Sequence, residues 1–267
     1  MAGRQAVLGR YRLLLVDLDG VVWRGGRLIE ENIAWLRRAR EMGAEVVFVT
    51  NNSTRSRRLY AERLTGVMGY RVETRDVVTS GYAVARLVRE RSGPSRVLVL
   101  GEEGLVEELA AQGHLVLNIS DPVRCPVDYV VVGLDRMLSY QKLRAAHEAV
   151  KRCGARIAAS NTDNVIPVER GDAPGAGAVL AALTASTGAE PALVAGKPEP
   201  YMYRLVLEER GVDPSEALAI GDRCDTDIEA ARRAGVDSVL VLTGVAGERG
   251  ERCNATYIAR SLGDLGS

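Results

Sequence analysis

Two aspartates that directly follow a short apolar run constrain this chain more than any other feature. Residues 13–16 read Leu-Leu-Leu-Val, and Asp17, Asp19 and Gly20 come after them. A short apolar run bounded by Gly is typical of a strand buried in a parallel sheet. The carboxyl end of such a strand lies at the edge where open α/β sheets bind ligands. Because two neighbouring carboxylates disfavour joint ionisation, we expect a divalent cation to offset their charge.

Strand-like apolar runs alternate with amphipathic helical stretches at both ends of the chain. This alternation predicts an α/β fold whose core is a doubly wound, Rossmann-like parallel sheet. The expected strands are 13–16, 46–49, 192–195, 217–220 and 239–242, and the expected helices are 31–42, 55–68, 201–210 and 227–234.

The middle of the chain has a separate α/β rhythm without strands that end in carboxylates. We therefore expect an inserted second domain over residues 80–172. The catalytic core domain would then consist of residues 1–79 and 173–267. A loop-like cluster at residues 171–175 marks the second boundary, and a helix over residues 179–187 would return to the core.

The composition is that of an ordinary globular protein and argues against several classes of partner. The 267 residues include 35 basic and 35 acidic side chains. The formal net charge is therefore zero, and the chain lacks the basic excess that would indicate a nucleic-acid partner. No apolar stretch is long enough to span a bilayer, and residues 1–10 lack the apolar core of a signal peptide. We expect a cytoplasmic protein with no membrane partner. The four cysteines form no C-x-x-C pair, which predicts reduced, structural thiols rather than a metal or redox site.

Polar residues follow four of the predicted core strands. Because the carboxyl ends of parallel strands share one edge of a sheet, we expect these residues to meet. Carboxylates without thiolate or imidazole ligands favour Mg²⁺, which takes one or two carboxylates together with a phosphate oxygen. The inventory therefore predicts phosphoryl transfer. Its members are Asp17, Asp19, Thr50, Asn51, Asn52, Lys197, Asp222 and Asp227.

These motifs resemble those of the haloacid dehalogenase superfamily, in its phosphatase majority. The resemblance rests on residues 17–20, on Thr50, on Lys197 before a proline, and on residues 221–227. Three stretches are similar to the branch that contains nitrophenyl, phosphoglycolate and pyridoxal phosphatases: residues 49–53, 196–202 and 242–245. The resemblance covers the core nearly end to end and implies that the insert is a large α/β cap that sets substrate specificity.

The resemblance also implies a role for each acidic residue. Asp17 would attack phosphorus and form an aspartyl-phosphate. Asp19 would protonate the leaving alcohol and then activate water, while its backbone carbonyl would ligate Mg²⁺. Asp17 and Asp222 would complete the protein ligands, with Asp227 acting through a water molecule or an outer contact.

The remaining members of the set would bind the phosphoryl group. Thr50 and Asn51 would hold its oxygens, and Asn52 is a further candidate for contact. Lys197 would neutralise charge on the nucleophile and on the transferring group. The expected activity is Mg²⁺-dependent hydrolysis of a small phosphorylated metabolite, such as p-nitrophenyl phosphate, 2-phosphoglycolate or a sugar phosphate.

Three other functions fit parts of the same pattern. Dehalogenation on this fold has little use for Asp19. A phosphotransferase or mutase, in which a sugar intercepts the aspartyl-phosphate, stays open. A non-catalytic phospholigand-binding regulator also stays open, although such proteins usually lose a nucleophile or metal ligand and none is missing. By analogy with caps of this size, we expect a homodimer.

Weaker candidates lie near the nucleophile and in the insert. Residues 21–28 predict a short hairpin with a Gly-Gly turn, in which Trp23 either helps to seal the site or packs under the cap. Residues 135–140 and 161–163 either face the site or serve as loop and helix caps. Some relatives carry a His before a Pro after the last cap strand. Ile166 stands there in this chain, which argues against pyridoxal phosphate as the preferred substrate.

Overall fold

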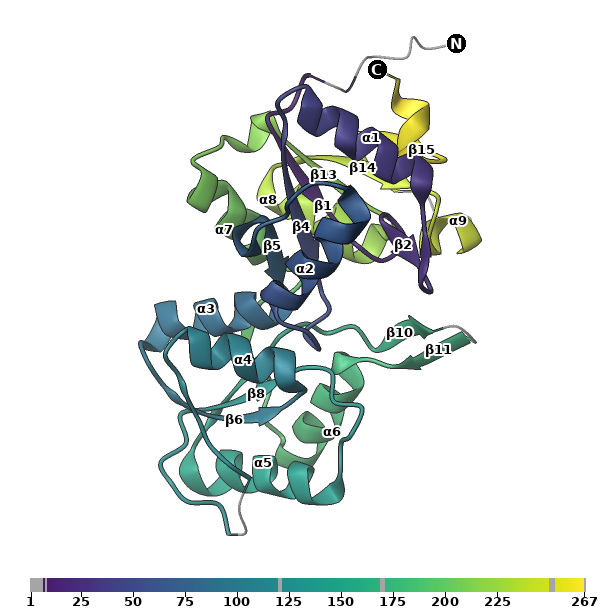
Figure 1. Ribbon diagram of the computed structural model, residues 1–267. Helices are drawn as coiled ribbons and strands as arrows, with labels where there is room; N and C mark the ends of the chain where they lie inside the picture. Colours follow the sequence, from purple (N-terminus) through teal and green to yellow (C-terminus); the bar gives the residue numbers. More distant parts are fainter. Residues whose placement is uncertain (1–6, 8, 120–121, 169–170, 250–252, 267) are drawn as a thin grey trace. The chain divides into compact units, whose positions relative to one another are not determined.

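The computed structural model describes residues 7, 9–119, 122–168, 171–249 and 253–266 (Figure 1). The chain divides into two compact units. The first unit consists of Met1–Thr50, Ala61–Val78 and Lys197–Ser267. The second unit consists of Asn51–Tyr60 and Thr79–Gly196. Each unit contains an α/β sheet of its own, as predicted for the core and the insert.

Within the described residues, the first unit is built on a six-stranded sheet with the order β15-β14-β13-β1-β4-β5. Strand β1 pairs in parallel with β13 on one side and β4 on the other, so that Leu13 lies opposite both Ala217 and Glu45. Every residue of β1 and β13 is buried, as expected for central strands covered on both faces. The bounds are β1 (Leu13–Val16), β4 (Glu45–Thr50), β5 (Val77–Thr79), β13 (Ala217–Gly221), β14 (Asp237–Val241) and β15 (Tyr257–Ala259).

The helices of the first unit follow the predicted alternation with the strands. Helix α1 has acidic residues in its first turn and arginines in its last turn, which suits the helix dipole. The predicted hairpin beside the nucleophile is confirmed as β2 (Trp23–Arg24) paired with β3 (Arg27–Leu28). The helical bounds are α1 (Glu30–Glu41), α2 (Arg57–Met68, which begins in the second unit), η1 (Thr74–Asp76), α7 (Tyr201–Arg210), η2 (Pro214–Glu216), η3 (Cys224–Ile228), α8 (Glu229–Ala234), α9 (Val245–Arg249) and η4 (Leu262–Leu265).

The second unit contains a five-stranded sheet with the order β12-β9-β8-β6-β7, and all its pairings are parallel. A separate two-stranded hairpin joins β10 and β11. The strands are β6 (Arg96–Leu100), β7 (Leu115–Val116), β8 (Tyr129–Val132), β9 (Arg156–Ala159), β10 (Val165–Val168), β11 (Gly171–Pro174) and β12 (Leu193–Val194). The helices are α3 (Ser80–Ser92), α4 (Glu103–Ala111), α5 (Tyr140–Cys153) and α6 (Ala176–Thr187).

The boundary between the units differs from the predicted one at residue 172. Helix α6 does not return to the core, because it buries Val179, Leu180 and Leu183 among apolar residues of the second unit. Strand β12 pairs with β9, so the expected core strand at 192–195 belongs to the other sheet. Residues 171–174 form β11 rather than a loop. The chain returns to the first unit only at Lys197. Local patterns identify a strand or a helix, but they do not say which sheet it joins.

The prediction of reduced cysteines is wrong for this structure. Cys125 and Cys153 form a disulfide within the second unit, with Cα atoms 5.4 Å apart. Cys224 and Cys253 form another within the first unit, with Cα atoms 5.9 Å apart. The partners are 28 and 29 residues apart in sequence. A search for closely spaced cysteines therefore misses pairs that only the fold brings together.

None of the helices in the described part of the chain has both the length and the apolar character needed to cross a bilayer.

Candidate active site

Three neighbouring strands of the first unit present polar residues at their carboxyl ends. Asp17 follows β1, Thr50 ends β4, and Asp222 follows β13. The Asp17 backbone N–H donates to the Ile220 carbonyl oxygen at 2.9 Å, so the hydrogen bonding between β1 and β13 continues to Asp17. Chain order reverses at β1, since β4 lies on one side and β13 on the other. Open α/β sheets bind ligands at such a switch point.

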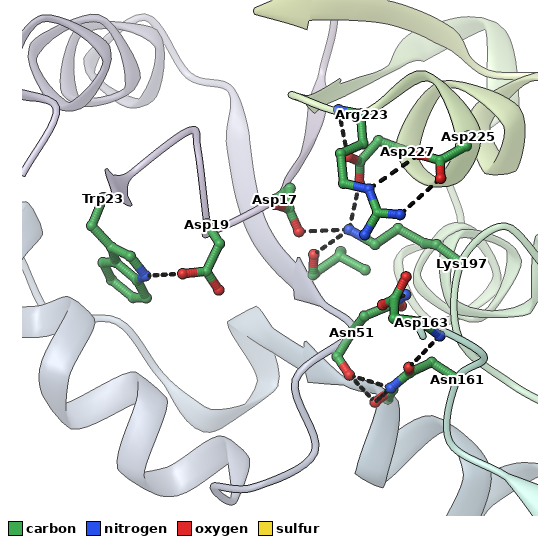
Figure 2. Close-up of polar contacts among 12 residues, drawn as sticks. Asp17, Asp19, Trp23, Asn51, Asn161, Asp163, Lys197, Arg223, Asp225 and Asp227 are labelled. Atoms are coloured by element: carbon green, nitrogen blue, oxygen red, sulfur yellow. Dashed lines mark hydrogen bonds and ion pairs between the residues drawn. The ribbon is translucent and has the colours of Figure 1, made fainter. Parts of the chain in front are cut away.

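Lys197 is the central cation of this edge, although no strand of the core sheet delivers it. Its Nζ donates to Asp17 Oδ1 at 2.6 Å, to Asp227 Oδ1 at 2.5 Å and to the Val49 carbonyl oxygen at 3.1 Å (Figure 2). The side chain is 2% exposed. The predicted residue is thus at the predicted place, but the chain reaches it where it returns from the second unit.

Three buried carboxylates lie close enough together to share a metal ion. Asp17, Asp222 and Asp227 each offer an oxygen, and these oxygens all lie within 4.8 Å of one another. The donor set contains neither sulfur nor imidazole, which fits Mg²⁺. One ammonium group, on Lys197, faces three carboxylates here, so a divalent cation would balance the charge that remains.

The backbone around Asp222 leaves room for its side chain and donates a hydrogen bond to it. The N–H of Val245, the first residue of α9, donates to Asp222 Oδ2 at 2.7 Å. A Cβ at Gly20 would lie 2.3 Å from this oxygen, and a Cβ at Gly244 would lie 2.0 Å from it. Gly20 also has a φ of +84°, which favours glycine. Both glycines are therefore needed for the carboxylate to occupy this place.

Asp227 lies on a short π-helical turn, η3, which replaces the first turn of the α-helix predicted at 227–234. Such turns occur frequently at functional sites. Asp227 Oδ2 accepts the Arg223 backbone N–H at 3.1 Å, while Oδ1 accepts from Lys197. A Cβ at Gly221 would lie 2.2 Å from the Asp227 Cβ, so the absence of a side chain at Gly221 leaves room for Asp227. Both Asp227 oxygens are thus engaged by protein donors.

The pKa values of Asp17, Asp222 and Lys197 are all raised above their ordinary values, for different reasons. Burial raises the pKa of Asp17 well above its ordinary value, and the Asp227 and Asp222 charges add to this while Lys197 opposes it. Burial, with the Asp227 charge, raises the pKa of Asp222 to about 7. Burial alone would lower the pKa of Lys197, but Asp17 and Asp227 outweigh it and raise that pKa. Burial and repulsion therefore both oppose ionisation of Asp17 and Asp222, and a bound cation would favour it.

Asp19 turns to a different partner from Asp17. Figure 2 shows Asp17 reaching toward Lys197 and Asp19 toward Trp23, whose Nε1 donates to Asp19 Oδ1 at 3.0 Å. The residue keeps solvent exposure, although protein atoms crowd its carboxylate. This crowding raises the pKa of Asp19, and the Trp23 hydrogen bond and the charge of Arg63 oppose the rise. Sequence patterns gave no signal for Arg63.

Asn51 and Asn52 belong to the second unit, in contrast to Thr50. The Asn51 side-chain amide donates to Asp163 Oδ2 at 2.8 Å, and Asn161 Nδ2 donates to the Asn51 carbonyl oxygen at 2.7 Å. The Asn52 side chain accepts the Thr54 backbone N–H at 2.9 Å in a local turn. Asn161 and Asp163, which the sequence marked only as weak candidates, therefore hold the residue that follows Thr50.

Asp135, a weaker candidate of the insert, and two further polar residues have structural partners within their units. Asp135 is paired with Lys142 at 2.8 Å, and Asp225 with Arg223 at the same distance. His114 is buried, where its ring accepts the Ser95 backbone N–H at 3.2 Å. These contacts account for the three residues as parts of the fold.

Comparison with known proteins places these motifs in a family. A family model described as haloacid dehalogenase-like hydrolase matches residues 14–114, and a second, HAD-hydrolase-like model matches residues 194–265. An acid sugar phosphatase of Staphylococcus saprophyticus is 38% identical over 235 residues, covering 88% of each chain. The Archaeoglobus fulgidus p-nitrophenyl phosphatase structure is 33% identical, with a TM-score of 0.85 over 96% of this chain and 98% of that one.

A glycerol phosphate phosphatase of Mycobacterium tuberculosis, solved in complex with magnesium, is 36% identical to this chain. Its TM-score is 0.87, and the match covers 98% of this chain and 78% of that one. Relatives above 30% identity thus match nearly the whole chain, and the two family models include the segments that bear Asp17, Thr50, Lys197 and Asp222. On this evidence, the chain belongs to the haloacid dehalogenase-like hydrolase family.

Proposed function

We propose that this protein is a Mg²⁺-dependent phosphatase that hydrolyses small phosphomonoesters through an aspartyl-phosphate. The observation that carries the proposal is the buried cluster in which Lys197 joins Asp17 to Asp227, with Asp222 beside them. The comparisons support it, because the matched proteins are named as sugar, nitrophenyl and glycerol phosphate phosphatases.

In the first step, an Asp17 carboxylate oxygen forms a bond to phosphorus while the bond from phosphorus to the ester oxygen breaks. Asp19 gives its proton to that oxygen, so the leaving group departs as a neutral alcohol. In the second step, Asp19 takes a proton from water as the water oxygen attacks phosphorus. The bond between phosphorus and Asp17 then breaks and releases inorganic phosphate. The two steps together return both side chains to their starting states.

The remaining site residues bind charge and orient the ester. Asp17, Asp222 and the Asp19 backbone carbonyl would hold Mg²⁺, which would supply charge neutralisation to the phosphoryl oxygens. Asp227 is suited to an outer position, because Lys197 and the Arg223 N–H already engage its two oxygens. Thr50 and Asn51, with Asn52 as a further candidate, would contact the phosphoryl oxygens. Lys197 would balance the charge that accumulates around phosphorus.

The second unit is proposed as the cap domain that selects the substrate. A sugar phosphate, glycerol phosphate or 2-phosphoglycolate would each fit the proposed chemistry, because each is a small alkyl phosphomonoester. A screen of such metabolites that reports kcat/KM would identify the preferred one. Added acceptor alcohols would show whether the phosphoryl group passes to water, as proposed, or to an alcohol, as in a phosphotransferase.

We also propose a cytoplasmic homodimer without a nucleic-acid partner. The balanced charge supports the absence of nucleic acid. The two disulfides then imply a cell interior like that of hyperthermophiles, whose intracellular proteins are rich in disulfides. Light scattering on the purified protein tests the dimer, and fractionation of the source cells tests the location.

The decisive test of the mechanism is Asp17→Asn, which removes the nucleophile and keeps the side-chain shape. We expect Mg²⁺-dependent release of p-nitrophenol to fall by at least about 10⁴-fold, as for other covalent nucleophiles. Acid quenching with labelled substrate should trap label on the wild-type protein and none on the variant. Asp225→Asn is the matched control, because Asp225 lies in the same motif but is 63% exposed. Substantial turnover by Asp17→Asn would contradict the mechanism.

A further inference from the structure

The indole of Trp23 is held in one place relative to Asp19. The Gly20 N–H donates to the Trp23 carbonyl oxygen at 2.7 Å, and the Trp23 N–H donates to the Leu18 carbonyl oxygen at 3.2 Å. Trp23 also pairs with Leu28 across the β2–β3 hairpin. Its side chain is buried. The turn thus fixes the backbone of Trp23 against the backbone on both sides of Asp19.

A second contact holds the plane of the ring. The Arg63 guanidinium lies over the Trp23 ring, with its central carbon 3.9 Å from the ring centroid. Arg63 comes from α2, which is remote in sequence from the hairpin. Cation–π stacking of this kind favours one orientation of the indole. The backbone contacts and this stacking together hold the indole with its Nε1–H toward Asp19.

The acidic residues of the site have donors of different kinds. Asp17 and Asp227 accept from the Lys197 ammonium, whereas Asp222 accepts from a backbone N–H. Among the described residues, the hydrogen bond to the Asp19 carboxylate comes from the neutral indole of Trp23. A single hydrogen bond from a neutral donor fixes the direction of the Asp19 carboxyl group without an ion pair.

We propose that Trp23 is a positioning residue that holds Asp19 for proton transfer to the leaving group. The inference rests on the proposed function. The indole N–H occupies Oδ1 and has no lone pair to accept a proton. The proton that Asp19 transfers therefore sits on Oδ2, and the indole holds this oxygen in a defined direction. Without the indole N–H, the carboxyl group would rotate about its terminal bond, and correctly aimed conformations would be less populated.

Trp23→Phe tests this role, because it keeps a buried aromatic ring under Arg63 and removes the N–H. The chain offers a matched control in Trp35, the other tryptophan. Trp35 is also buried, and its Nε1 has no hydrogen-bond partner among the described residues. Trp35→Phe therefore makes the same chemical change in the same unit, at an indole nitrogen with no hydrogen bond among the described residues.

The readout is the ratio of kcat/KM for p-nitrophenyl phosphate to that for glycerol phosphate. Nitrophenolate is a stable anion and leaves without a proton, whereas the alkoxide of glycerol needs one. General acid catalysis contributes about 10²–10⁴-fold, so misplacing the acid should lower kcat/KM for glycerol phosphate by about 10–100-fold. The value for p-nitrophenyl phosphate should fall less than about threefold, because its leaving group does not need the acid. Trp35→Phe should leave the ratio unchanged.

An equal loss on both substrates, or no loss on either, would overturn the proposal. Thermal denaturation shows whether Trp23→Phe is folded. If it is not, Arg63→Gln removes the stacking group from the surface and leaves Trp23 intact. That variant should move the ratio in the same direction by a smaller factor, and an unchanged ratio would count against the inference. A wild-type protein that hydrolyses neither ester would refute the proposed function instead, and the inference would fall with it.

Discussion

At the scale of single residues, Asp222 shows how strongly the fold changes a carboxylate. Its burial, with Asp227 nearby, raises its pKa to about 7, against an ordinary value of 3.8. The folded protein therefore binds a proton at pH values where the unfolded chain has released it. The contribution of Asp222 to the free energy of unfolding is therefore largest at low pH, and it falls as the pH rises from about 4 to about 7. The buried Asp222 carboxylate therefore lowers the stability of the metal-free protein near neutral pH.

Asp222→Asn should accordingly stabilise the metal-free protein at pH 8 by on the order of 2 kcal/mol. The Asn side-chain oxygen still accepts the Val245 N–H, while the buried charge is gone. The gain should be smaller at pH 5, where the folded wild-type protein is already largely protonated at this position. Urea denaturation in EDTA at the two pH values measures both effects. The prediction fails if the variant is the less stable protein at pH 8.

At the scale of elements, the Cys224–Cys253 disulfide joins the π-helical turn that carries Asp227 to the segment that follows α9, the helix that binds Asp222. Cys224 begins the π-helical turn that carries Asp227. Cys253 lies beyond α9, whose first N–H holds Asp222. Both cysteines also pack against a small apolar cluster with Ile228. The bond therefore links the two segments that place the carboxylates.

Replacing Cys224 and Cys253 by Ser should lower the free energy of unfolding by about 3–4 kcal/mol, because the unfolded chain regains the entropy that a closed loop of this length removes. The same change should weaken the binding of Mg²⁺. The Cys125–Cys153 pair is the matched control, since it closes a loop of nearly equal length in the other unit. Its double Ser variant should lose similar stability and keep the Mg²⁺ concentration for half-maximal activity. Circular dichroism and Mg²⁺ titrations make the comparison. Equal Mg²⁺ dependence in both variants would show that the first disulfide does not position the site.

At the scale of the whole molecule, the carboxylates and Lys197 belong to one unit, although the chain leaves and re-enters that unit between them. The second unit supplies a separate sheet and a separate apolar core. Both tryptophans, Trp23 and Trp35, lie in the first unit. Tryptophan fluorescence therefore reports the unfolding of the unit that carries the site.

Mg²⁺ should stabilise the first unit, because a ligand that binds only the folded state adds about 2.7 kcal/mol at one hundred times its Kd. The midpoint of the fluorescence transition should move to higher urea concentration with Mg²⁺. Asp222→Asn should remove most of that shift, because it takes a charged ligand from the cluster. A wild-type transition that does not respond to Mg²⁺ would speak against a metal site at these residues.

Much of the fold could be predicted because its strands and helices carry local signals. Strand 13–16 and helix 201–210 are found with the predicted bounds, and the hairpin was marked by its Gly-Gly turn. The assignment of residues 173–196 was wrong, because the apolar residues of a helix fit more than one core. The disulfides were missed because their partners lie 28 and 29 residues apart. The Trp23 contact with Asp19 had no sequence signal, since it depends on the direction of one side chain.

The sequence by itself determined the parallel α/β architecture and the chemical types gathered at the strand ends, because both follow from periodicity and from short motifs read along the chain. Only the tertiary structure decided that the chain reaches Lys197 where it re-enters the first unit, that Asp227 pairs with Lys197, and that Asp19 turns to Trp23. These relations join residues that are distant in sequence or depend on a side-chain direction. They are set by packing and burial, whose energies depend on all neighbours at once.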